Sequence, residues 1–183
     1  MTTHTLIKEQ ILDYALRFPA EARVATRYLA LLEHPDAFLR THQPGHITGS
    51  AFIISEDYSQ TLLVHHAKLN RWLQPGGHAD GDRDVVRVAL REASEETGII
   101  ELELVSVDIY DLDIHPIPER KEFPAHDHYD IRFLLKASMA DPLIVSEESH
   151  DVRWVPLGDL ERYNQESSLL RLRTKLSNNP AAL

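Results

Sequence analysis

The stretch "PGGHADGDRDVVRVALREASEETGI", from Pro75 to Ile99, joins a glycine loop to an acidic segment with helical periodicity. Asp84 precedes the apolar pattern and suits a helix N-cap, because its side chain can accept a hydrogen bond from a first-turn amide. Gly98 suits the left-handed position that follows many helices. We therefore predict a helix over residues 85–97, with small and β-branched residues on its buried face.

The charge of this helix is concentrated on one face, because Glu92, Glu95 and Glu96 stand at positions i, i+3 and i+4. Like charges at this spacing destabilise a helix by about 0.2–0.5 kcal/mol per pair. Arg91 can pair with Glu95 across one turn, but the other carboxylates need another partner. An acidic face is most often simply solvated. The two glycines of the preceding loop favour a different reading, since they let backbone carbonyls approach the carboxylates, and magnesium prefers oxygen ligands.

The same stretch resembles the signature box of Nudix hydrolases: Gly, five residues, Glu, seven residues, then Arg-Glu-apolar-x-Glu-Glu-x-Gly-apolar. Gly77 begins the box, and residues 91–99 match its second half at the correct spacing. Arg83 stands where the family has its first glutamate. The flanks "WLQPGG" and "VRWVPLGDL" are also similar to that family, so the resemblance extends over residues 47–163.

The resemblance implies an α/β (α+β) fold, a mixed-sheet sandwich with flanking helices. It also implies an enzyme that hydrolyses a diphosphate linkage in a nucleoside diphosphate derivative, with Mg²⁺ or Mn²⁺ as cofactor. The carbonyl of Gly77 and the side chains of Glu95 and Glu96 would bind the metal. Glu92 would be a further ligand or the base that orients water, and Arg91 would hold a glutamate by ion pairing. A divalent metal suits this reaction, because it neutralises phosphate charge and lowers the pKa of bound water.

The segment "SEESHDVRW", from Ser146 to Trp154, contains another candidate carboxylate. Many Nudix enzymes carry a downstream glutamate in a loop before a Trp-containing strand, as a metal ligand or a general base. Glu148 fits this role by its distance from Trp154. The alternative is that Glu147 and Glu148 are solvated loop side chains.

A second candidate site lies in "HPIPERKEFPAHDHYD", residues 115–130. If residues 125–131 are extended, His126, His128 and Asp130 point to one side. Imidazole and carboxylate suit zinc or another transition metal, and protonated histidines could instead hold a substrate phosphate. The three prolines of this segment favour a third interpretation, a polar strand end beside a loop.

The remaining pattern predicts two units. Residues 1–45 form a helical N-terminal segment, and residues 46–183 form the catalytic domain with C-terminal helices. Strand-like runs are "ITGSAFIIS", "QTLLVHH", "ELELVSVDIY", "YDIRFLLKA" and "VRWV". We expect the N-terminal segment to cap the site or to form a homodimer interface.

Composition limits the partners. The formal net charge is −10, which argues against broad binding to DNA. The chain has no cysteine, so disulfides and thiolate sites are excluded. The absence of a signal-peptide pattern and of a membrane-spanning apolar run gives the expectation of a cytoplasmic protein with a small nucleotide-derivative substrate and no membrane contact. Two alternatives stay open: a non-catalytic Nudix-like module that binds a nucleotide or metabolite, and an RNA end-processing hydrolase.

Overall fold

The computed structural model describes residues 3–120 and 124–178. In chain order the elements are α1 (Thr3–Arg17), η1 (Pro19–Glu21), α2 (Ala22–Leu31), β1 (Gly45–Ser55), β2 (Gln60–His66), β3 (Arg71–Leu73), β4 (Gly76–His78), α3 (Val85–Thr97), β5 (Glu103–Leu104), β6 (Asp111–Ile117), β7 (His126–Ala137), β8 (Ser149–Pro156), η2 (Leu157–Asp159), α4 (Leu160–Tyr163) and α5 (Ser167–Asn178). Within those two ranges, none of the helices has the length and apolar character that a transmembrane span requires.

A mixed sheet of eight strands forms the centre of the molecule. The long strands β1 and β7 run parallel, with His46 opposite His128 and Ser50 opposite Arg132. Because β7 pairs along the whole of β1, the remaining partners of β1 share its other edge. There β4 pairs with Thr48 to Ser50, and β2 pairs near Ile54. The glycines of β4 therefore lie beside the middle of the sheet.

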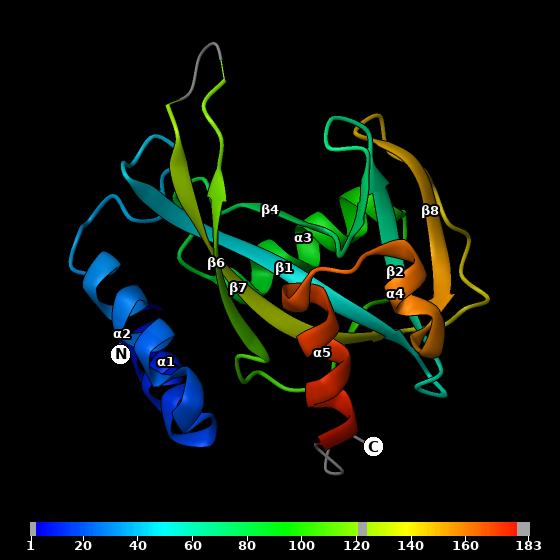
Figure 1. The fold of residues 1–183 in the computed structure, drawn as a ribbon, viewed down its shortest axis with the longest axis horizontal. Coiled ribbons are helices and arrows are strands. Elements are labelled where there is room, and N and C mark those ends of the chain that lie inside the picture. The colour runs from blue at the N-terminus through cyan, green and yellow to red at the C-terminus, as the bar shows by residue number, and fades with distance from the viewer. Residues whose placement is uncertain (1–2, 121–123, 179–183) are drawn as a thin grey trace.

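The helices α3 and α5 cover opposite faces of this sheet (Figure 1). Side chains alternate along a strand, and β1 shows the result. Ile53 belongs to the hydrophobic cluster that contains Ala93 of α3, whereas Phe52 belongs to the cluster that contains Leu172 of α5. The acidic helix is thus fixed on one face, and the C-terminal helix on the other. This arrangement confirms the predicted fold class, a mixed sheet with flanking helices.

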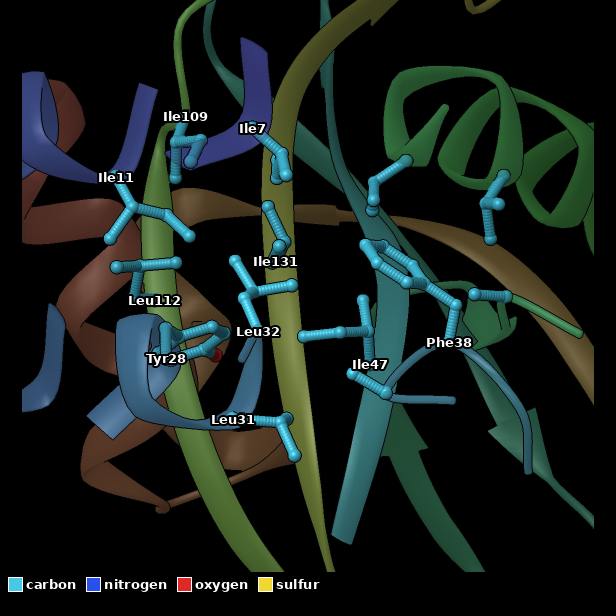
Figure 2. Close-up of a cluster of buried hydrophobic side chains, with 14 of the residues drawn as sticks. Ile7, Ile11, Tyr28, Leu31, Leu32, Phe38, Ile47, Ile109, Leu112 and Ile131 are labelled. Carbon is cyan, nitrogen blue, oxygen red and sulfur yellow. The ribbon is translucent and has the colours of Figure 1, made fainter. Parts of the chain in front are cut away.

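The N-terminal helices share a hydrophobic core with the sheet. Figure 2 shows Ile11 and Leu32 gathered with Leu112 and Ile131, and all four side chains are buried. Full burial of an aliphatic side chain of this size contributes about 1.5–3 kcal/mol. The predicted helical character of residues 1–45 is confirmed by α1 and α2. The division into a segment 1–45 and a catalytic domain 46–183 stays a prediction.

A buried charged network joins the C-terminal helix to the sheet. Asp111 of β6 pairs with Arg132 of β7 at 3.2 Å, with Arg171 of α5 at 2.8 Å and with Lys175 of α5 at 2.7 Å. Asp113 also pairs with Arg132 and Arg171, each at 3.1 Å. Arg132 is 3% exposed, and a buried charge is tolerated only when it is paired and hydrogen-bonded. The network therefore fixes the position of α5 on the sheet.

The local predictions for the acidic helix are confirmed. The helix spans Val85–Thr97, and the side chain of Asp84 accepts a hydrogen bond from the amide of Arg87 at 3.1 Å. Gly98 has a φ of 79°, a left-handed conformation that glycine adopts without a steric penalty.

One strand prediction was wrong in extent, and one strand was missed. The run over residues 101–110 forms only the two-residue strand β5, whereas residues 111–117, partly assigned to a loop, form β6. Pro116 is tolerated there, because in the described part of the chain β6 pairs with β7 alone, and a proline at a sheet edge removes no ladder hydrogen bond that the strand needs. Pairing between distant segments, rather than local pattern, decided this region.

Candidate active site

The glycine strand β4 lies directly against the acidic face of α3. A Cβ atom added to Gly77 would clash with the carboxylate of Glu92, so a larger residue at this position would displace that carboxylate. The amide of Gly76 donates a hydrogen bond to Glu96 Oε2 at 3.1 Å. The strand β4 and the helix α3, which are close in the sequence, therefore contribute to the same site.

Arg91 fixes the carboxylates and the strand relative to each other. Its guanidinium lies 2.8 Å from Glu92 and 3.2 Å from Glu95, and it donates a hydrogen bond to the carbonyl of His78 at 3.1 Å. The expected i, i+4 pair with Glu95 is present. Because one planar guanidinium has several donors in fixed directions, Arg91 can serve all three partners.

The carboxylates repel one another in a partly buried environment. Burial, followed by the charges of Glu92, Glu148 and Glu95, raises the pKa of Glu96 to about 8, although the Gly76 amide opposes the shift. Burial also raises the pKa of Glu92, and Glu95 and Glu148 add to that increase against the opposing charge of Arg91. Glu148 thus lies within electrostatic reach of the other carboxylates, and its carbonyl accepts a hydrogen bond from the amide of Ala67 at 2.8 Å.

This donor set fits a hard divalent cation. Such a cation takes oxygen ligands, and its charge would oppose both the burial and the weaker mutual repulsion that raise the pKa values of Glu92 and Glu96. The structure brings Glu92, Glu96 and Gly77 together, with Glu95 on the exposed edge of the same helix face. The roles of these residues stay predictions.

Arg83 contacts the segment after α2. It donates a hydrogen bond to the carbonyl of Pro35 at 3.1 Å, and its guanidinium lies 5.7 Å from the centre of the Phe38 ring. The neighbouring aspartates have other partners, since Asp82 binds Arg87 at 2.6 and 2.8 Å and Asp80 forms an ion pair with Arg40. Arg83 therefore connects the loop before α3 to the segment after α2.

A group of histidines occupies the other face of β4. His46 of β1, His78 of β4 and His128 of β7 offer nitrogens that all lie within 4.8 Å of one another. The ring of His126 stacks on His46 with a centroid distance of 4.9 Å. Burial and then the positive charge of Arg40 lower the pKa of His78 to about 4, and burial and His78 lower the pKa of His128 to about 2.

The structure places Asp130 outside this histidine group. Its carboxylate accepts hydrogen bonds from Thr48 at 3.0 Å, Ser50 at 2.7 Å and Arg132 at 2.8 Å. Sequence reasoning missed His46, which is 1% exposed. No local pattern could have found it, since it meets His128 only through the parallel pairing of two strands about eighty residues apart.

A mixed sheet with flanking helices, in which a glycine strand faces an acidic helix, agrees with the fold that the sequence resemblance implies. The NUDIX domain model matches residues 45–173. The chain therefore belongs to the Nudix family.

Two curated proteins are similar to part of this chain. A probable DHNTP pyrophosphohydrolase of Lactococcus lactis subsp. cremoris (strain MG1363) is 32% identical over 93 residues, which cover 49% of this chain and 53% of that protein. Nucleoside diphosphate-linked moiety X motif 6 of Xenopus laevis is 36% identical over 84 residues, covering 44% of this chain and 37% of that protein. The chain thus spans about half or less of the length of these relatives.

Solved structures share the fold. A C. elegans Ap4A hydrolase binary complex has a TM-score of 0.60 at 22% identity, covering 75% of this chain and 98% of that one. A NUDIX-family hydrolase from Clostridium perfringens has a TM-score of 0.55 at 24% identity, covering 72% of this chain and 96% of that one. At these identities the likeness shows the fold alone.

Proposed function

We propose that this chain is a divalent-metal-dependent pyrophosphohydrolase that cleaves a diphosphate linkage in a small nucleoside diphosphate derivative. The observation that carries the proposal is the approach of Gly76 and Gly77 to Glu92 and Glu96, with Glu148 in electrostatic reach. A solvated acidic face would have no need of a glycine strand packed against it. The name of the Lactococcus lactis relative, a probable pyrophosphohydrolase, supports the reaction class.

Mg²⁺ or Mn²⁺ would be held by the Gly77 carbonyl and by carboxylates from Glu92, Glu95 and Glu96. When bound, the metal would neutralise phosphate charge and activate water. Arg91 would hold Glu92 and Glu95 in position, as its ion pairs with both indicate.

Glu148 is the candidate proton acceptor for the attacking water. Glu92 and Glu95 are ion-paired with Arg91, and Glu96 accepts the Gly76 amide. Among the described residues, no hydrogen bond or ion pair holds the carboxylate of Glu148. A general base must reach the water from which it takes a proton, and a carboxylate on a loop without such partners can make that approach.

A substrate panel tests this function. Nucleoside triphosphates, dinucleoside polyphosphates and nucleoside diphosphate sugars are incubated with the protein and Mg²⁺, and the products are identified by mass spectrometry. We expect at least one class to yield a nucleoside monophosphate or pyrophosphate, with Glu96→Gln giving the contaminant background. Equal turnover by the parent and Glu96→Gln would count against the proposal.

The binding-module alternative rests on Arg83, which departs from the family box. The contacts of Arg83 with Pro35 and Phe38 give this residue a structural role. Its presence is therefore compatible with catalysis, because its contacts lie with Pro35 and Phe38, whereas Arg91 pairs with Glu92 and Glu95. Tight nucleotide binding without turnover in the same panel would favour the binding module.

A further inference from the structure

The second face of β4 carries a group of nitrogen donors that the proposed hydrolysis does not use. His46, His78 and His128 come from three adjacent strands, β1, β4 and β7. Strands of one sheet are rigid supports, so the three side chains are kept close together before any ligand arrives. Each of the three side chains offers one nitrogen, and these nitrogens all lie within 4.8 Å of one another.

Two of the three rings have a buried nitrogen without a partner. Nε2 of His46 and Nε2 of His128 make no hydrogen bond in the described part of the chain. A buried polar atom without a partner is costly and indicates an unfilled interaction. Nδ1 of His46 lies 3.3 Å from the carbonyl of His42. A carbonyl can only accept, so in the neutral ring Nδ1 carries the proton and Nε2 presents a lone pair.

We propose that His46, His78 and His128 bind one divalent transition-metal ion, zinc, at a site separate from the carboxylate group. Three imidazoles are a ligand set that zinc accepts, with a fourth position left for water or another donor. In a metal-binding histidine, the ring nitrogen that does not bind the metal usually donates a hydrogen bond to a carbonyl or carboxylate. Nδ1 of His46 has such a partner in the carbonyl of His42.

The required movement is small. Zinc–nitrogen distances of about 2.0–2.1 Å in a tetrahedral site put two nitrogens about 3.3 Å apart. Nitrogens within 4.8 Å reach that separation by shifts of about 1.5 Å or less, which side-chain rotation supplies. His126 stacks on His46 and its own Nδ1 lies 2.8 Å from the carbonyl of Pro124, so its Nε2 is a candidate for the fourth position.

An anion is the competing ligand, because protonated histidines can hold phosphate. The neutral-ring tautomer at His46 opposes it, since a lone pair attracts a cation and repels an anion. Bound zinc would also join β4 to β1 and β7 beside Gly77. We therefore expect zinc to stabilise the fold independently of any substrate.

The test uses the full-length, untagged protein with millimolar Mg²⁺ present, so that the carboxylate site is filled. After stripping with chelator, incubation with zinc and gel filtration, elemental analysis should find about one zinc per chain. The melting temperature should rise by at least about 5 °C at a hundredfold excess of free zinc over the Kd. His78→Gln and His128→Gln should each weaken zinc binding by at least about 100-fold, because changes to outer-shell groups alone cost 10–100-fold.

His150→Gln is the matched control, since His150 is an exposed histidine on β8, and it should bind zinc like the parent. If His128→Gln misfolds by circular dichroism, His78→Gln decides the question, because it alters a half-buried residue of a short strand. Fewer than 0.1 zinc ions per chain in the parent, or full binding in the folded variants, would overturn the proposal. A thermal shift with inorganic phosphate but none with zinc would overturn it as well. Every readout is a binding measurement, so the result stands whether or not diphosphate hydrolysis is found.

Discussion

At the residue scale, Arg83 shows how a departure from a family pattern can be structural. Arg83 is exposed, and its hydrogen bond to Pro35 and its contact with the buried ring of Phe38 are each worth about 1 kcal/mol. We predict that Arg83→Ala leaves the maximal rate within about tenfold of the parent and lowers stability slightly. Steady-state kinetics and urea unfolding measure both quantities. A rate loss of more than about 100-fold in the folded variant would place Arg83 in the catalytic site instead.

Gly77 gives the sharpest prediction at this scale. A methyl group at Gly77 would meet the carboxylate of Glu92, whereas one at Gly158 would meet nothing within 4 Å. Gly77→Ala should therefore displace Glu92 and lower the rate by at least about tenfold, while Gly158→Ala should leave it unchanged. The measurement is hydrolysis at saturating Mg²⁺ with folding checked by circular dichroism. Equal rates for the two variants would mean that the contact has no catalytic role.

At the element scale, the sequence predicted the elements whose signals come from residues close together in the chain. The helix Val85–Thr97 follows from its cap, its apolar period and its terminal glycine, and the structure has all three. The short strand β4 lacks such a signal, because it exists only by pairing with β1. The edge strand β6 was missed for the same reason, and His46 became a candidate only once β1 and β7 were paired. The carboxylate site could thus be located from one segment, whereas the histidine site required the assembled sheet.

At the scale of the whole molecule, the charged network under α5 connects distant parts of the chain. Removing one member leaves the other charges buried and uncompensated, which typically costs about 3–5 kcal/mol. We predict that Arg132→Met destabilises the protein by that amount in urea unfolding. Arg162→Met is the control, because Arg162 pairs with Asp159 while 77% exposed, and exposed pairs contribute about 0–1 kcal/mol. Similar losses for both variants would refute a special role of the buried network.

The central claim is that the carboxylates facing β4 bind the divalent metal on which diphosphate hydrolysis depends. The most direct measurement is the hydrolysis rate of the best substrate against free Mg²⁺, starting from chelator-treated protein. The comparison includes Glu96→Gln and, as an exposed control on α1, Glu9→Gln. The account predicts no turnover without metal, full recovery in the parent and in Glu9→Gln, and a maximal rate at least about 100-fold lower in Glu96→Gln, a barrier increase of about 2.7 kcal/mol. Turnover that is independent of metal, or a normal rate in folded Glu96→Gln, would contradict it.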